Sequence, residues 1–233
     1  YQSAVPADAM KKHEDEKPKN APKKDFGFIT IAAGEGLAEI FKGLGVDEVI
    51  QGGQTMNPST EDILNAADKI NADTIFVLPN NSNIILASNQ AASIIEDKKL
   101  VVIPTKTIPQ GITAMINFEL TRSADENEKA MLESLSTVKS GQLTYAVRDT
   151  SIDGKEIKKD NYLGLGDKGL ASVGTDMDDT LIDMLSEFVD DESELISVYY
   201  GEDIDENKAE ELVSKIEEKF DGVDVELQYG GQP

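Results

Sequence analysis

The chain has 233 residues, enough for one large or two small domains. It has no cysteine and a single histidine, His13, in a charged stretch, which excludes disulfides, thiolate zinc sites, cysteine nucleophiles and histidine-based triads. Its 45 acidic and 22 basic residues give a net charge of −23, so nucleic-acid phosphates and anionic membranes would repel it. No apolar run approaches the ~18 residues of a membrane helix, and we expect no integral membrane contact. The lack of cysteine suits a reducing compartment, and we expect a cytoplasmic protein.

The N-terminal stretch is rich in lysine, glutamate and proline and has no large apolar residue after Met10. Such a composition buries too little apolar surface to offset the entropy lost on ordering. We therefore predict a flexible charged linker over residues 1–24. Because the chain begins at Tyr1 with no secretory signal, we interpret it as a fragment of a longer protein.

Short apolar strands alternate with helical patterns over the next hundred residues. The predicted strands cover residues 28–32, 48–51, 73–78 and 100–103, and the predicted helices cover residues 34–42, 58–70 and 83–96. This alternation is typical of a parallel sheet covered by helices on both faces. We assign residues 25–118 to a parallel α/β lobe.

The pattern changes in the rest of the chain, residues 119–233. Helices are predicted over residues 126–138, 178–189 and 208–220, strands over 142–148, 162–163, 170–173, 195–200 and 223–228, and a hairpin turn at Asp153-Gly154. These elements indicate a mixed α+β lobe. Residues 1–120 carry a net charge of −5 and residues 121–233 a net charge of −18. The acidic surface either keeps the protein solvated or forms a docking face for a basic partner.

Polar loops follow the four predicted parallel strands. Ligands of open α/β sheets bind beyond the carboxyl ends of the strands, and these loops supply amides, hydroxyls, glycines and one lysine. Such groups can hold a carboxylate, a phosphate or a peptide group, or they can simply form turns and cap helices. The candidate ligand or partner site consists of Gly34, Glu35, Gly53, Gln54, Thr55, Asn57, Asn80, Asn81, Asn83, Thr105, Lys106 and Thr107.

Two motifs suggest catalysis, but each meets an objection. Gly34-Glu35-Gly36 follows a strand as in a dinucleotide site, yet the third glycine position holds Glu39, and Glu35 would repel a pyrophosphate. Residues 176–180 (DMDDT) resemble the nucleophile loop of haloacid-dehalogenase-type phosphatases, which use two aspartates and magnesium. Only 53 residues follow Thr180, too few for the rest of that fold. In the alternative, Asp176 or Asp178 caps a helix.

Five segments carry a family resemblance: residues 51–64 (QGGQTMNPSTEDIL), 78–85 (LPNNSNII), 103–112 (IPTKTIPQGI), 146–150 (AVRDT) and 162–165 (YLGL). They resemble the C-terminal region of the YloV-type, dihydroxyacetone-kinase-like proteins, the large A subunit of bacterial fatty acid kinase. The resemblance covers residues 25–233. It implies an α/β, DegV-like two-lobe fold with a parallel α/β sheet lobe followed by a mixed α+β lobe.

The resemblance also implies which functions belong to the other domains of proteins in that family. An N-terminal kinase domain binds ATP and magnesium, and a middle domain carries cysteine and histidine residues; this chain has neither domain. The implied partners are a DegV-type fatty-acid-binding carrier and the protein's own kinase and middle domains. Within this fragment we expect no catalytic residue, metal or cofactor.

The carriers hold the acyl carboxylate with a Ser-Gly-Thr segment after the third strand, where this chain has Asn83-Ile84-Ile85. Their polar loop after the second strand corresponds to residues 53–55. We therefore expect a non-catalytic module that recruits the carrier so that the kinase domain can phosphorylate the acyl carboxylate. The alternative is a DegV-like domain that itself binds an acyl or phosphorylated ligand, and the third hypothesis is the phosphatase that uses Asp176 and Asp178.

Overall fold

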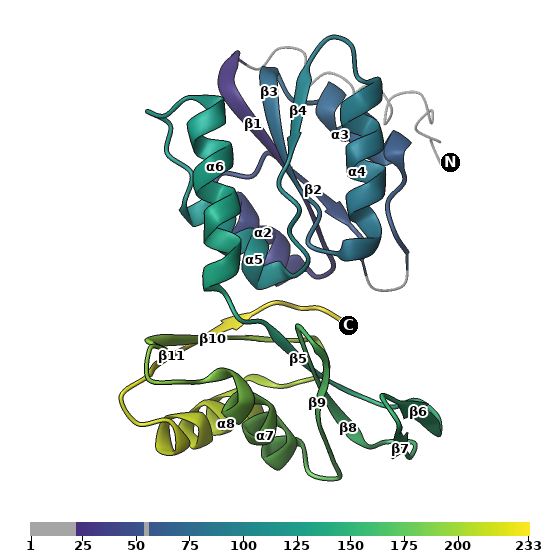
Figure 1. Ribbon diagram of the computed structural model, residues 1–233, viewed down its shortest axis with the longest axis vertical. Coiled ribbons are helices and arrows are strands. Elements are labelled where there is room, and N and C mark those ends of the chain that lie inside the picture. The colour runs from purple at the N-terminus through teal and green to yellow at the C-terminus, as the bar shows by residue number, and fades with distance from the viewer. Residues whose placement is uncertain (1–21, 54–55) are drawn as a thin grey trace, which may run out of the picture. The chain divides into compact units, whose positions relative to one another are not determined.

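The computed structural model describes residues 22–53 and 56–233, and it divides into two compact units (Figure 1). The first unit contains the chain up to Ala33 and Leu37–Leu135, and the second contains Gly34–Gly36 and Ser136–Pro233. The division falls at Leu135, whereas the sequence pattern predicts a lobe boundary after residue 118. Of the predicted linker, residues 1–21 lie outside the described residues, and Lys24 is the first residue of a strand.

The first unit is built on a four-stranded parallel sheet in the order β2-β1-β3-β4. Its strands are β1 (Lys24–Ala32), β2 (Glu48–Gln51), β3 (Ala72–Leu78) and β4 (Lys99–Val102). The predicted parallel sheet is therefore confirmed. In the register, Thr30 of β1 lies beside Leu78 of β3, so these strands end at the same edge of the sheet.

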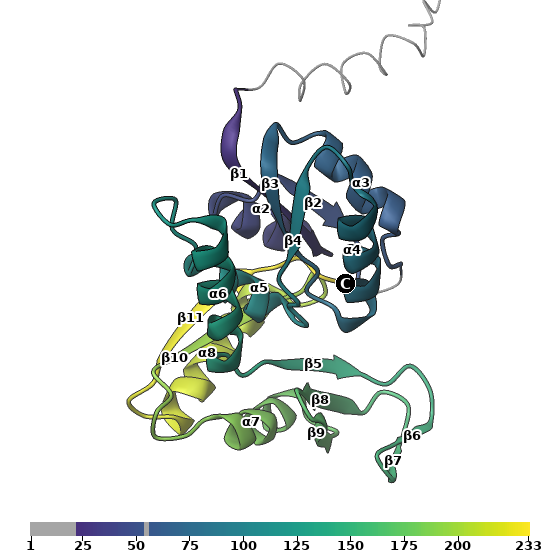
Figure 2. The same ribbon diagram turned by 45° about the horizontal axis from the view of Figure 1, so that its top comes forward.

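Helices cover both faces of this sheet, as Figures 1 and 2 show. They are α2 (Glu35–Gly43), α3 (Thr60–Asp68), α4 (Ser82–Ile94), α5 (Ile108–Ile116) and α6 (Ala124–Ser134). On the face of α3 and α4, buried isoleucines such as Ile29, Ile63 and Ile84 form one apolar cluster. On the other face, Phe118 after α5 packs edge-on against Phe28, with ring centroids 4.7 Å apart. Alternating side chains of β1 thus supply both cores.

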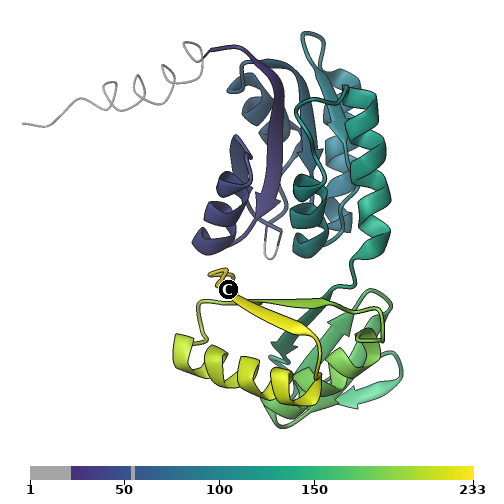
Figure 3. The same ribbon diagram turned by 90° about the vertical axis from the view of Figure 1, so that its left-hand side faces the viewer.

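The second unit is a mixed α+β structure with three small sheets. Its strands are β5 (Gly141–Tyr145), β6 (Thr150–Ile152), β7 (Lys155–Ile157), β8 (Tyr162–Gly166), β9 (Gly169–Gly174), β10 (Leu195–Tyr200) and β11 (Asp224–Tyr229). Its helices are α7 (Met177–Phe188) and α8 (Glu206–Lys219), and the short helix η1 (Leu135–Thr137) lies at the division between the two units. Strands β5, β8 and β9 are antiparallel, whereas β10 and β11 are parallel and are joined through α8 (Figure 3).

The predicted hairpin turn is confirmed in the second unit. Strands β6 and β7 pair antiparallel, and the turn residues Asp153 and Gly154 both have positive φ, at 50° and 80°. Positive φ at both turn residues suits the tight turns that match the twist of a two-stranded ribbon.

None of the helices in the described residues combines the length and apolar character that crossing a bilayer requires.

Candidate functional site

The carboxyl edge of the parallel sheet is held together by a buried amide, that of Asn80. Its Nδ2 donates to Thr30 Oγ1 (2.7 Å) and to the carbonyl of Ile31 (3.0 Å), both in β1. Its Oδ1 accepts from Thr105 Oγ1, and its backbone N–H donates to the same hydroxyl oxygen, each at 2.9 Å. Thr30 Oγ1 in turn donates to the carbonyl of Leu78 (2.9 Å). The network therefore links the ends of β1, β3 and β4.

The backbone around Asn80 is fitted closely to this network. Asn80 has φ of +60°, the left-handed region that asparagine enters more readily than most residues. Gly111 in α5 lies against the amide, and a Cβ at that position would come within 2.1 Å of Asn80 Oδ1. Asn80, Thr30 and Thr105 are all buried. Hydrogen bonds inside the protein thus occupy the side chains of Asn80 and Thr105, the two candidate site residues that are buried.

The neighbouring residue, Asn81, connects this edge to β2, the strand that the Asn80 network does not reach. Its Nδ2 donates to the carbonyl of Gly53, in the loop after β2, at 2.8 Å. Its Oδ1 accepts from the backbone N–H of Asn83 at 2.8 Å and so caps α4. Two consecutive asparagines therefore connect the loop after β3 to the ends of all the other strands in the sheet.

The helices that follow these loops are capped by the chain's own side chains. Thr107 caps α5 by accepting from the N–H of Gln110 (3.2 Å), and Gln110 Oε1 accepts from the N–H of Lys106 (2.7 Å). Ser59 and Asp62 form a reciprocal capping box at the start of α3. Helix N-termini attract anions because their first N–H groups lack partners. Here several of these N–H groups already have one.

The remaining candidate residues do not join the buried network. Asn57, Asn83 and Lys106 are exposed, as is Glu35, the first residue of α2. Gly34 and Glu35 belong to the second compact unit by their contacts. Gln54 and Thr55 lie outside the described residues. Ile84, which the resemblance sets against the glycine of the carriers' carboxylate-binding segment, is fully buried in the apolar cluster that includes α3 and α4 residues.

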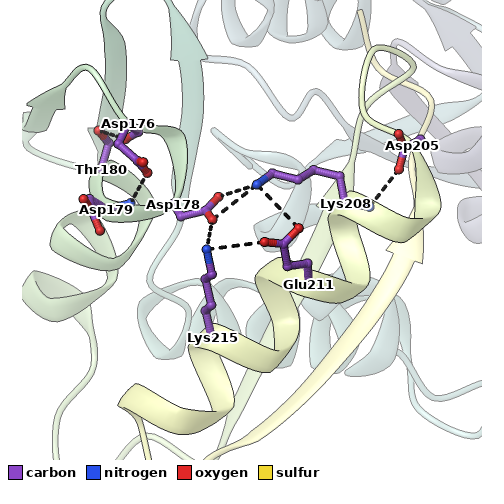
Figure 4. Close-up of polar contacts among 8 residues, drawn as sticks. All are labelled: Asp176, Asp178, Asp179, Thr180, Asp205, Lys208, Glu211 and Lys215. Carbon is purple, nitrogen blue, oxygen red and sulfur yellow. Dashed lines mark hydrogen bonds and ion pairs between the residues drawn. The ribbon is translucent and has the colours of Figure 1, made fainter.

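The aspartate motif of residues 176–180 opens α7 (Figure 4). Asp176 is the N-cap, and its Oδ1 accepts from the N–H of Asp179 at 3.0 Å. The capping alternative is therefore confirmed for Asp176. The preceding strand, β9, pairs antiparallel with β8, whereas α/β ligand loops follow parallel strands. Within the described residues, no group of three acidic or histidine side chains is placed to hold a metal ion.

Asp178 is buried at the seam between α7 and α8, with 7% of its surface exposed. Lys208 Nζ lies 3.0 Å from its Oδ1 and 3.2 Å from its Oδ2, and Lys215 Nζ pairs with Oδ2 (Figure 4). Glu211 lies between the two lysines, 3.8 and 3.5 Å from their Nζ atoms. Burial works to raise the pKa of Asp178, but the hydrogen bonds from Lys215 and Lys208 outweigh it, and the pKa falls below its usual value. The hydrogen bond with Asp178 also raises the pKa of Lys215, against a smaller opposing effect of burial.

The sequence pattern alone does not identify the partners that give these residues their roles. Thr30 lies in a strand predicted from its apolar residues, but a lone hydroxyl in such a strand requires a buried partner and is itself a signal. Lys208 and Lys215 lie seven residues apart in an acidic helix, two turns on the same face. That spacing is a readable signal for a shared acidic partner.

The sequence model for the C-terminal domain of FakA-like fatty acid kinase proteins matches residues 27–233. The chain belongs to this family. Protein YloV of Bacillus subtilis (strain 168) is 46% identical over 211 residues, which are 91% of this chain and 38% of YloV. Protein SAR1202 of Staphylococcus aureus (strain MRSA252) is 46% identical over 209 residues, which are 90% of this chain and 38% of that protein. The chain therefore spans 38% of the length of these relatives.

Three solved structures show that this member of the family has a DegV-like fold. A DegV family protein from Ruminococcus gnavus, described with vaccenic acid, has a TM-score of 0.59 at 9% identity and covers 90% of this chain and 94% of its own. The Thermotoga maritima TM841 protein, described as revealing a fatty acid binding function, has a TM-score of 0.61 at 12% identity, covering 88% and 92%. The Streptococcus pneumoniae Fatty Acid Kinase (Fak) B3 protein, loaded with linoleic acid, has a TM-score of 0.59 at 11% identity, covering 89% and 93%.

Proposed function

We propose that this chain is a non-catalytic docking module of a cytoplasmic fatty acid kinase. It recruits a fatty-acid-loaded carrier of the DegV type, so that a kinase domain elsewhere in the protein can phosphorylate the acyl carboxylate. In that step a carboxylate oxygen bonds to the γ-phosphorus of ATP, and ADP leaves. Family membership supports the parent activity, and the Fak B3 neighbour supports a carrier as the partner.

The observation that carries the proposal is the closed hydrogen bonding at the carboxyl edge of the sheet. A ligand site needs polar groups that are free to turn toward the ligand. The amides of Asn80 and Asn81 instead bind Thr30, Thr105 and the carbonyl of Gly53. Ile84 fills core space at the position where the resemblance places the carriers' glycine. These features favour a carrier-like fold that binds a partner protein on its surface and holds no ligand at this edge of the sheet.

ATP and magnesium belong, on this proposal, to other domains. Gly34-Glu35-Gly36 does not suit a nucleotide, because Glu35 adds a negative charge beside the glycines. We expect the purified chain to show neither ATP hydrolysis nor acyl-phosphate formation when it is mixed with a loaded carrier, fatty acid and magnesium-ATP. Turnover under these conditions would contradict the non-catalytic role.

A second function is favoured by a different observation. The neighbours described with vaccenic and linoleic acid share this fold, so a ligand-binding domain for an acyl or phosphorylated ligand is the alternative. Native mass spectrometry of the purified chain, incubated with linoleic acid, separates the two functions. A docking module should stay free of fatty acid and bind the loaded carrier in a sensor-surface assay. A stoichiometric fatty-acid adduct without carrier binding would favour the alternative.

A further inference from the structure

One exposed helix of the first unit, α4, carries no charged residue (Figure 2). Charged residues make up 29% of the whole chain, and among the α-helices of the described residues only α4 and α5 lack them. The exposed side chains of α4 are Ser82, Asn83, Leu86, Asn89, Gln90, Ser93 and Ile94. At 100° per residue they lie on one arc of about 140°, which we call the α4 face.

The α4 face combines apolar and amide groups as the centre of a protein interface does. Leu86 is 67% exposed and Ile94 is 57% exposed, and they lie about 12 Å apart along the helix with Gln90 between them. Interface centres are depleted in charged residues and hold apolar anchors, while surfaces that face only water are commonly a quarter or more charged. The face therefore has the composition of a covered surface.

A hollow of about 360 Å³ adjoins the α4 face at the C-terminal end of the helix. Leu64, Ile94 and Ile95 supply apolar walls, and three carboxylates accompany them: Asp68, Glu96 and Asp97. Lys98 also lines the hollow, but its Nζ donates to the carbonyls of Ala67 (2.7 Å) and Ile70 at the end of α3. An open hollow with both apolar walls and carboxylates suits the aliphatic stem and charged head of a lysine or arginine side chain.

We propose that the α4 face and this hollow are the docking surface for the fatty-acid-loaded DegV-type carrier. The inference rests on the proposed function and adds the surface to it. The carrier presents an uncharged face with an apolar depression for Leu86, and a lysine or arginine beside it enters the hollow. A second copy of this chain suits the hollow poorly, because each copy carries a net charge of −23. The occupant is therefore a different protein with a basic side chain at the rim of the interface.

The test measures binding of the loaded carrier from the same genome to the immobilised whole chain. We expect Leu86→Asp to weaken binding at least tenfold, because it places a charge at the centre of the interface. Leu120→Asp is the matched control, since Leu120 is 65% exposed outside α4, and its affinity should stay within twofold of the wild type. The double variant Leu86→Ser/Ile94→Ser adds no charge and should still weaken binding about fivefold or more. Unchanged melting curves establish that the variants are folded.

Two charge variants test the hollow. Asp68→Asn/Glu96→Gln/Asp97→Asn removes three charges there, and Asp179→Asn/Asp183→Asn/Glu187→Gln removes three exposed charges from α7. We expect the first to raise the dissociation rate of the carrier and the second to change only its association rate, because lost contacts act mainly on dissociation.

The outcomes separate this surface from the function itself. If the wild-type chain does not bind the loaded carrier, the docking function fails and the surface fails with it. If the wild type binds but Leu86→Asp behaves as Leu120→Asp does, the docking function stands and the α4 face is wrong. If sedimentation shows a dimer of the wild-type chain that Leu86→Asp dissolves, the occupant is a second copy and the proposal is overturned.

Discussion

Asn80 and Thr105 are joined by two hydrogen bonds that share one hydroxyl group, that of Thr105. The backbone N–H of Asn80 donates to Thr105 Oγ1, and Thr105 Oγ1 donates to Asn80 Oδ1, each at 2.9 Å. The hydroxyl serves as acceptor and donor to the same residue, and both residues are buried. This pair joins β3 to the end of β4, and the other end of the Asn80 amide reaches β1.

Asn80→Ala should destabilise the protein by about 2–4 kcal/mol. In this variant the buried hydroxyl groups of Thr30 and Thr105 lose their hydrogen bonds with the Asn80 amide. Alanine must also adopt the left-handed backbone conformation of residue 80. Urea unfolding followed by circular dichroism measures the change. Asn83→Ala is the control, because Asn83 is exposed and its replacement should shift stability by no more than about 0.5 kcal/mol. A stable Asn80→Ala variant would show that the network is dispensable for folding.

Asp178→Asn should destabilise the second unit by about 1–3 kcal/mol near neutral pH. Lys208 and Lys215 would then lose the carboxylate that pairs with both, although their own partial exposure limits the loss. Asp179→Asn, one residue away and exposed, is the matched control and should change little.

The effect of Asp178 depends on pH in a stated direction. Its pKa is lower in the folded protein than in the unfolded chain, because the hydrogen bonds from the lysines outweigh burial. The charged carboxylate therefore stabilises the fold fully above the unfolded pKa, and this contribution is lost as the pH falls through the lower, folded pKa. Melting of wild type and Asp178→Asn across pH 3–7 should show a gap that narrows toward the acid end. A constant gap would contradict the pairing.

Asp176→Ala should cost about 0.5–2 kcal/mol, the usual effect of a lost helix cap. The Asp176 carboxylate accepts from the N–H of Asp179, which would be left without its partner. On the proposed function, the kinase that contains this chain should still form acyl phosphate when it carries Asp176→Ala. Hydrolysis of a phosphomonoester by the wild-type chain, abolished by Asp176→Ala, would instead favour the phosphatase hypothesis.

Carrier association should slow as salt rises. Residues 121–233 carry a net charge of −18, and two of the lysines there are paired with Asp178 and Glu211, so the exposed acids of α8 are little neutralised. Such a field steers a basic partner over a Debye length of ~8–10 Å. Surface plasmon resonance from low to high salt tests this for the wild type and for Glu210→Gln/Glu217→Gln/Glu218→Gln, which should show a weaker salt dependence. An on-rate independent of salt would remove the steering hypothesis and leave docking itself standing.

Local patterns predicted much of this protein, and contacts between distant residues supplied the rest. The turn at Asp153-Gly154 and the cap at Asp176 depend on residues within a few positions, so their chemistry is visible in the sequence. Asn80 meets Thr30 from 50 residues away and Thr105 from 25 residues away. Only the register of the folded sheet brings those three together, so the sequence showed a polar loop without showing that its amide is already bound.

The same reason explains the lobe boundary. The composition changes near residue 120, but α6 after that point packs on α5 and belongs to the first compact unit. Its buried Met131 faces the core, while most of its other side chains are polar. A mostly polar helix of this kind could cover the surface of either lobe. Only its packing against α5 shows that it belongs to the first one.

The absence of a side chain at Gly111 restricts which residues members of this family can have at positions 80 and 111. The space a Cβ would occupy there is filled by the amide oxygen of Asn80, 2.1 Å from the position of that atom. A larger residue at 111 therefore requires a shorter one at 80, and the two substitutions should be strongly non-additive. Among relatives, the two positions should change together or remain as asparagine and glycine, which makes them a pair to expect in covariation between these distant segments.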